Sequence, residues 1–152
     1  MYTNTLQLNI NIMISILETV NRCKLFLNLP AVKVNQIPYS LYKEIPANCR
    51  GIYILEDQLQ RAIYVGKGWI RTRQSTHWDK ALGTVKNYHK DPVGWQYLRE
   101  HNDGPLEPKE WTIYYVEVLK ETAITAMEGA LIHLLQPLAN DETYRDTMPG
   151  DQ

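Results

Sequence analysis

The chain has 152 residues, of which 44% are hydrophobic and 22% are charged, so its length and composition suit one globular domain with its own core. The formal net charge of −1 excludes a chain that is basic overall, and no apolar run is long enough to cross a bilayer. The early run 8–17 lacks a basic leader and a small-residue cleavage site. Because the two cysteines form neither a disulfide framework nor a zinc motif, we expect reduced thiols in a cytoplasmic protein.

Apolar spacing and residue preferences predict, in chain order, a helix over 12–27, strands over 51–55 and 62–65, helices over 70–80 and 91–101, a strand over 111–119 and a helix over 122–136. Three prolines in 30–50 predict a segmented approach to the first strand. Asp91 and Pro92 have the residue types of an N-cap and a first helical position. This order predicts an α/β fold of the α+β type, in which helices flank a small, mostly antiparallel sheet of three strands.

The same pattern predicts one core region with an extension at each end. Residues 51–140 form this core region, with an insertion at about 80–110. Residues 1–50 are expected to be a helical and extended segment that packs on the core or precedes it. Residues 141–152 are polar, and we expect a loose tail.

Tyr53 and Tyr64 lie on the two strands of the predicted hairpin. A turn centred between Gln58 and Leu59 would make the two tyrosines direct cross-strand neighbours, with their hydroxyls close together. The turn residues are not of the Asn-Gly type, so this register is inferred from spacing alone. A pair of packing aromatic side chains is the alternative interpretation.

Glu128 lies in the sector of the last helix that Ile124, Leu131 and Leu135 mark as facing the core. Ionised carboxylates are seldom buried without a partner. Glu128 is therefore a misplaced surface charge, a member of a buried ion pair or a ligand at the edge of a cleft.

Arg73 and His77 are spaced four residues apart and share one helix face. A guanidinium suits a phosphate that gains charge in a transition state, and a neighbouring histidine can orient water or move a proton. An incidental pair on a surface helix is the alternative.

The positive charge of the chain is concentrated in one stretch. Residues 61–90 carry seven basic residues and one acidic residue, a formal charge of +6, which leaves −7 on the rest. This asymmetry favours docking of a polyanion on one face, although a solvated charged helix would give the same pattern. Aromatic residues between the basic ones, including Trp78, could stack on exposed bases. The expected nucleic-acid-binding residues are Trp69, Arg71, Lys80, Lys86 and Lys90.

The order and spacing of these residues resemble the signature of the GIY-YIG nuclease family over about residues 51–140. Gly51-Ile52-Tyr53 is followed, after ten residues, by Tyr64-Val65-Gly66. The remaining features of the family are matched by Lys67, Arg73, His77, Glu128, Pro137 and Asn140. The interval from Gly66 to Arg73 is about one residue shorter than in many relatives, so Arg71 competes for the arginine role. We favour Arg73 because of its spacing to His77.

The resemblance implies a metal-dependent endonuclease that hydrolyses phosphodiester bonds, with DNA as the favoured substrate. Glu128 would hold Mg²⁺ or Mn²⁺, and Arg73 would neutralise charge on the phosphate. A tyrosine would accept the proton of the attacking water. We favour Tyr53 for this role, with Tyr64 and His77 orienting the water, and Tyr64 as the base stays open.

Two further residues have supporting roles in this scheme. Lys67 would contact phosphate or lower the pKa of a tyrosine. Asn140 would position a tyrosine or the backbone near the site. A non-catalytic nucleic-acid-binding module that keeps the same fold is the competing interpretation.

Overall fold

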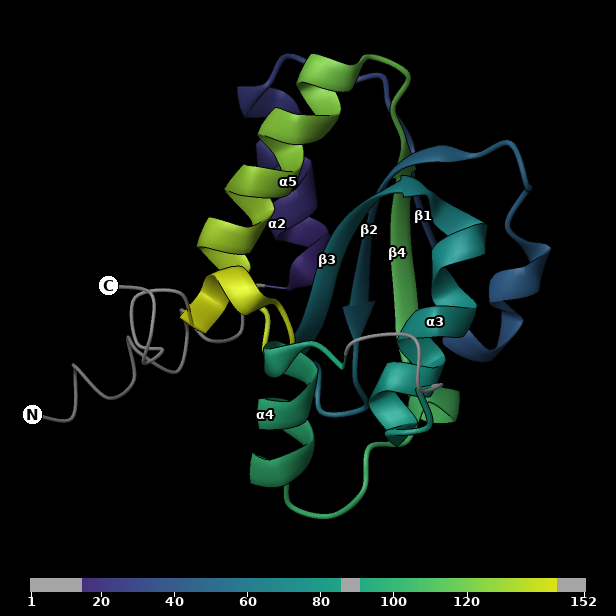
Figure 1. Ribbon diagram of the computed structural model, residues 1–152. Coiled ribbons are helices and arrows are strands. Elements are labelled where there is room, and N and C mark those ends of the chain that lie inside the picture. The colour runs from purple at the N-terminus through teal and green to yellow at the C-terminus, as the bar shows by residue number, and fades with distance from the viewer. Residues whose placement is uncertain (1–14, 86–90, 145–152) are drawn as a thin grey trace, which may run out of the picture.

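The computed structural model describes residues 15–85 and 91–144, which form one antiparallel sheet with helices on both faces (Figure 1). The strands lie in the order β1-β4-β2-β3. Their bounds are β1 Val34–Pro38, β2 Arg50–Glu56, β3 Ala62–Trp69 and β4 Thr112–Glu117. The α+β class and the antiparallel pairing agree with the expectation, but the sheet has four strands rather than three.

The additional strand is β1, which pairs with β4 at the edge of the sheet opposite to β3. Its five residues end in Pro38, a residue type that predicts a break in a strand. Proline is tolerated here because β1 is an edge strand, in which a missing N–H interrupts no central ladder. The proline-rich composition of 30–50 therefore conceals a strand.

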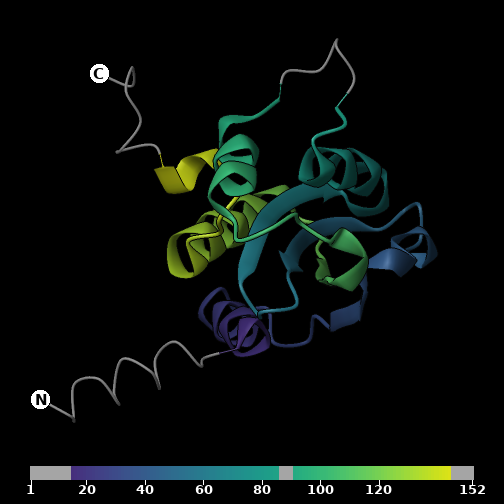
Figure 2. The same cartoon turned by 90° about the horizontal axis from the view of Figure 1, so that it is seen from below.

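The helices form a layer on each face of the sheet (Figures 1 and 2). One layer contains α2 (Ile16–Phe26) and α5 (Glu121–Leu135). The other contains α3 (Ile70–Leu82), α4 (Val93–His101) and the short 3₁₀ helices η1 (Tyr39–Glu44) and η2 (Pro108–Glu110). A last 3₁₀ helix, η3 (Asp141–Tyr144), follows α5, so the first four residues of the expected loose tail are ordered. Residues 145–152 lie outside the described part of the chain.

Each face of the sheet has its own hydrophobic core. On β4, Ile113 belongs to the core under α3, whereas Tyr114 and Val116 belong to the core under α5, as strand alternation predicts. Val20 and Tyr39 are fully buried in these two cores, one in each. The described part of residues 1–50 is therefore integral to the fold and does not merely precede it.

The start of α4 differs from the expectation. Its N-cap is Pro92, which has no side-chain capping bond. Asp91 instead forms an ion pair with Arg99 on the same helix. Because Arg99 also donates to the carbonyl of Lys80, this pair ties the start of α4 to the last turn of α3.

The β2–β3 hairpin has a different register from the predicted one. Tyr53 is opposite Gly66, and Leu55 is opposite Tyr64. The cause is the turn, in which the Asp57 carboxylate accepts from the backbone N–H of Leu59 and Arg61 at 3.0 and 2.8 Å. Gln60 takes a positive φ of 63°, and the register shifts at a bulge next to Glu56. Tyr53 and Tyr64 still share one face, with ring centroids 6.2 Å apart.

Gly51 lies where two strands approach closely. A Cβ atom at this position would be 1.9 Å from the carbonyl oxygen of Val116 on β4. Only glycine fits there, which explains the first glycine of the Gly51-Ile52-Tyr53 motif in structural terms. Within the described ranges, 15–85 and 91–144, no helix has the length and apolar character needed to cross a membrane.

Candidate active site

The candidate site lies at the edge strand β3, because residues from both helical layers meet there. The segment after α5 seals part of this edge, where the Ala139 N–H donates to the Ile63 carbonyl at 2.8 Å. The Asn140 amide then binds both backbone groups of Val65, accepting from its N–H at 2.8 Å and donating to its carbonyl at 2.9 Å. Asn140 therefore positions the backbone of the strand that carries Tyr64, which is one of the two alternatives expected for it.

Tyr53 and His77 form a buried pair between β2 and α3. The Tyr53 hydroxyl lies 2.6 Å from Nε2 of His77, and the two residues are 1% and 3% exposed. Burial, followed by the charges of Lys80 and Arg73, lowers the pKa of His77 to about 3, so the imidazole is neutral near pH 7. Because burial also raises the pKa of Tyr53, its hydroxyl is protonated, and it is hydrogen-bonded to Nε2 of the neutral imidazole.

Two glycines of β3 leave space for functional side chains. A Cβ atom on Gly66 would lie 2.3 Å from the Tyr53 hydroxyl, so the tyrosine ring can cross β3 only because residue 66 is glycine. Gly68 has a φ of 119°, a conformation that L side chains rarely adopt. The Arg73 guanidinium lies against it, with Nε 3.6 Å from the position of a Cβ atom.

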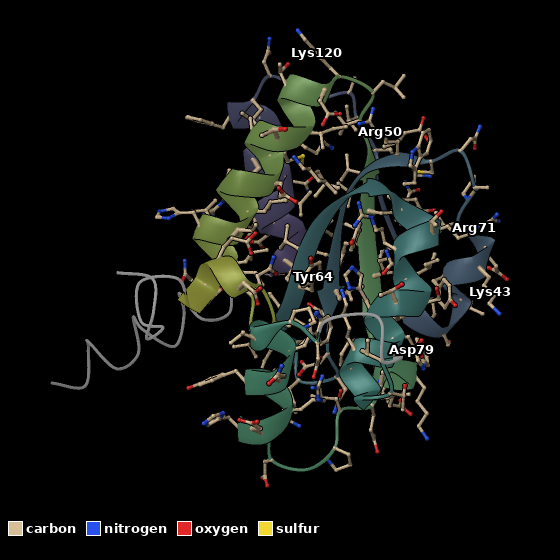
Figure 3. The ribbon with its side chains drawn as sticks, in the orientation of Figure 1. Lys43, Arg50, Tyr64, Arg71, Asp79 and Lys120 are labelled. Atoms are coloured by element: carbon tan, nitrogen blue, oxygen red, sulfur yellow. The ribbon has the colours of Figure 1, made fainter. Side chains whose placement is uncertain are left out.

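Tyr64 is the more accessible of the two tyrosines. Its ring packs 4.3 Å from the His77 ring and 5.7 Å from the Trp95 ring, measured between centroids, and its side chain is partly exposed. Figure 3 places it between α3, α4 and α5. Burial raises its pKa to about 12, and the charges of Glu142 and Glu128 contribute, whereas Arg73 lowers it. A small cavity of about 140 Å³ is lined by Tyr64, Pro92, Trp95, Ala139, Asp141 and Glu142.

Arg73, rather than Arg71, faces this cluster. The charge of Arg73 opposes the effect of burial on the pKa of both Tyr64 and Glu128. Arg71 precedes it by two residues and so lies roughly 200° around the helix. Figure 3 shows Arg71 on the side of α3 that faces away from Tyr64. Within the described part of the chain, the exposed Arg73 guanidinium forms no ion pair and is open to an anion.

Glu128 approaches the same strand from the opposite face. Its carboxylate lies 3.9 Å from the Lys67 ammonium, and its side chain is 24% exposed. Lys67 also donates to the Thr125 hydroxyl at 3.3 Å. Burial raises the pKa of Glu128, Lys67 opposes this shift, and Glu142 adds to it. Glu128 is therefore a partly exposed member of an ion pair at the edge of the site.

The donor chemistry around Glu128 fits a hard divalent cation that keeps most of its own water. Mg²⁺ is commonly held by one or two carboxylates, with waters and substrate phosphate completing its shell. Glu128 supplies one carboxylate, and the charge of Glu142 is close enough to raise its pKa. Across the residues that the structure describes, no cluster of three or more His, Cys, Asp or Glu side chains could hold a metal ion. A single carboxylate of this kind would suit a hydrated divalent cation such as Mg²⁺ or Mn²⁺.

The other expected nucleic-acid-binding residues are dispersed. Trp69 is the N-cap of α3 and is 53% exposed. Lys80 lies on the same face of α3 as Arg73, and burial lowers the pKa of Lys80. Lys86 and Lys90 lie outside the described residues.

Two residues of the positive stretch do not belong to a binding face. Arg61 binds Asp57 at 2.7 Å in the hairpin turn, at the other end of β3. Trp78 is partly buried, and its ring packs 5.2 Å from the ring of Tyr39 against the hydrophobic core, measured between centroids.

Sequence reasoning missed the contribution of η3. The Asp141 carboxylate accepts from the Gly94 N–H at 2.7 Å and so fixes the start of α4 beside the site. The neighbouring Glu142 raises the pKa of Tyr64. The available signal was a pair of acidic residues immediately after Asn140.

Comparison of the chain with protein-family models, with curated proteins and with solved structures gave no match in any of the three. The function of the site therefore has to be inferred from its own chemistry.

Proposed function

We propose that this protein is a metal-dependent endonuclease of the GIY-YIG type, which hydrolyses phosphodiester bonds, with DNA as the favoured substrate. One observation carries the proposal: at the edge of β3 lie a partly exposed tyrosine, a partly exposed carboxylate and an exposed arginine that forms no ion pair within residues 15–85 and 91–144. These side chains are Arg73, Tyr64 and Glu128, and they come from three different elements. They are a cation for phosphate, a group that can take a proton and a ligand for a divalent ion.

Each group has a role that follows from its surroundings. Arg73 binds the non-bridging oxygens of the phosphate, because a guanidinium matches that geometry and stabilises the charge that develops there. Glu128 would hold Mg²⁺ or Mn²⁺, which when bound supplies Lewis-acid stabilisation of phosphate and of the leaving oxygen. Lys67, now paired with Glu128, is placed to contact a phosphate when the carboxylate engages the ion.

Of the two tyrosines, we favour Tyr64 as the group that accepts the proton of the attacking water, after its hydroxyl has released its own proton to solvent and become the phenolate that the charge of Arg73 and of a bound cation would favour. Tyr53 is 1% exposed and its hydroxyl is hydrogen-bonded to His77, so its buried position leaves no access for an attacking water. The ring of His77 packs against Tyr64 and is held from behind by Tyr53. The buried pair therefore positions Tyr64, and Arg73 lowers the pKa that burial has raised.

Tyr64→Phe is expected to reduce the rate of the chemical step by roughly 10²-fold or more, the usual size of a lost general base. Substrate affinity should change little, since phenylalanine keeps the ring contacts with His77. Tyr53→Phe, which only frees His77 to reorient, should have the smaller effect. Single-turnover cleavage and anisotropy binding measure both quantities, and a larger loss in Tyr53→Phe would make Tyr53 the base.

The proposal as a whole is tested by incubating supercoiled plasmid and short labelled DNA with the protein in Mg²⁺, Mn²⁺ or chelator. We expect cutting only with a divalent ion, and none in Glu128→Gln protein purified in parallel, which controls for contaminating nucleases. Binding without cutting under every condition would instead support the non-catalytic module. The observation that favours this second function is the Lys67–Glu128 ion pair, which neutralises the carboxylate.

A further inference from the structure

Trp69 is an exposed aromatic ring beside the candidate site. It is the last residue of β3, and 53% of its surface is open to solvent. Trp95 and Trp111, in contrast, are almost completely buried in the core. An exposed indole offers a large planar surface on which an aromatic ligand can stack.

One face of this ring is covered by an arginine whose own position is fixed. Arg50 is the cross-strand partner of Trp69, and its Cζ atom lies 5.9 Å from the ring centroid. The Arg50 guanidinium also forms an ion pair with Glu121 in the first turn of α5. The indole is thus supported on one side, while its exposed area remains available to a planar ligand.

The position of the ring relates it directly to the proposed site. Side chains alternate along a strand, so Trp69 and Lys67 project on the α5 face, where Lys67 meets Glu128. Gly68 lies between them in the sequence, and the Arg73 guanidinium packs against Gly68 on the opposite face of the strand. A nucleic acid with its phosphate between Glu128 and Arg73 would place the adjoining nucleotide next to the indole.

We propose that Trp69 is a stacking platform for one unpaired base next to the scissile phosphate. This inference rests on the proposed nuclease function and names its substrate class, which is nucleic acid that is single-stranded or locally unpaired at the cut site. In an intact duplex, both faces of each base are covered by neighbouring base pairs, so no face is free for the indole. Lys67 lies on the same face of β3 as the ring, two residues before it, and its positive charge suits a phosphate next to a stacked base.

The test compares two DNA substrates of one sequence, an intact duplex and a duplex with a short unpaired bubble, bound in chelator by wild type, Trp69→Ala and Trp69→Phe. Leu59→Ala is the matched control, because Leu59 is 66% exposed in the distant hairpin turn. We expect wild type to prefer the bubble, Trp69→Ala to lose roughly 10-fold in bubble affinity with duplex affinity little changed, and Trp69→Phe to keep part of the preference. A 2-aminopurine base in the bubble should be quenched by wild type and not by Trp69→Ala.

The outcomes separate this inference from the proposed activity. Equal affinity of wild type for the two substrates, or an equal loss on both in Trp69→Ala, overturns the stacking platform even if the protein cuts DNA. Stacking that depends on Trp69, in a protein that cuts nothing, supports the platform and overturns the nuclease function.

Discussion

Glu128→Gln protein is expected to fold normally and to lose at least roughly 10³-fold in cleavage rate, since an ion held by Glu128 would stabilise the transition state by several kcal/mol. Glutamine keeps the size of the side chain but is a poor ligand for Mg²⁺. Burial raises the pKa of Glu128, so the folded state favours its protonated form over the charged form. The ionised carboxylate therefore destabilises the folded state at pH values above the raised pKa, and this destabilisation disappears in acid, where Glu128 is protonated in both the folded and the unfolded chain.

The thermal midpoint of Glu128→Gln should accordingly equal or exceed that of wild type at pH 7, with the difference disappearing as the pH falls towards 4. The ion pair with Lys67 limits the gain, because the carboxylate is partly solvated and partly compensated. Glu100→Gln, an exposed position on α4, is the control for removing one negative charge. A folded Glu128→Gln protein that cuts at the wild-type rate would contradict the assignment, as would full activity in excess chelator.

Arg73→Ala is expected to cost roughly 10²- to 10³-fold in turnover, the range found when a donor to a developing negative charge is removed. Arg71→Ala should cost only a few-fold, because Arg71 lies on another face of α3 and acts only as a distant positive charge. Arg73→Lys keeps the charge but not the planar fork, so it should recover only part of the loss.

These two arginines form a matched pair for measurement, since they lie in the same helical turn and differ only in the face that they occupy. Single-turnover rates at saturating DNA separate catalysis from binding. The reverse ranking would mean that the phosphate approaches α3 from its outer side, and the cluster around Tyr64 would then not be the active site.

The site shows where sequence reasoning succeeds. The sector of α5 that contains Glu128 follows from helical periodicity, and the structure finds the residue half-buried in that sector. The common face of Arg73 and His77 follows from their spacing in the same way. What spacing could not give is the depth of His77, which is 3% exposed because Tyr53 and Trp95 pack around it.

The β2–β3 hairpin and the strand β1 are features that the sequence did not predict correctly. Alternation placed both tyrosines on one face, yet their register depended on a turn in which the Asp57 side chain replaces the missing Asn-Gly signal. The strand β1 was hidden because Pro38 reads as a breaker unless the strand is known to lie at an edge. Both errors concern tertiary context, which local residue preferences do not contain.

The two hydrophobic cores determine the spacing of the side chains that meet at the edge of β3. The helix that carries Arg73 packs on one core and the helix that carries Glu128 packs on the other, so the spacing between these two side chains depends on the packing of both layers. Ile70 on α3 and Met127 on α5 are fully buried, one in each core. A methylene gained or lost at either position would shift one helix relative to the sheet and so change the distance between the Arg73 and Glu128 side chains. In the proposed nuclease, interior substitutions would therefore change turnover although Arg73 and Glu128 are both retained.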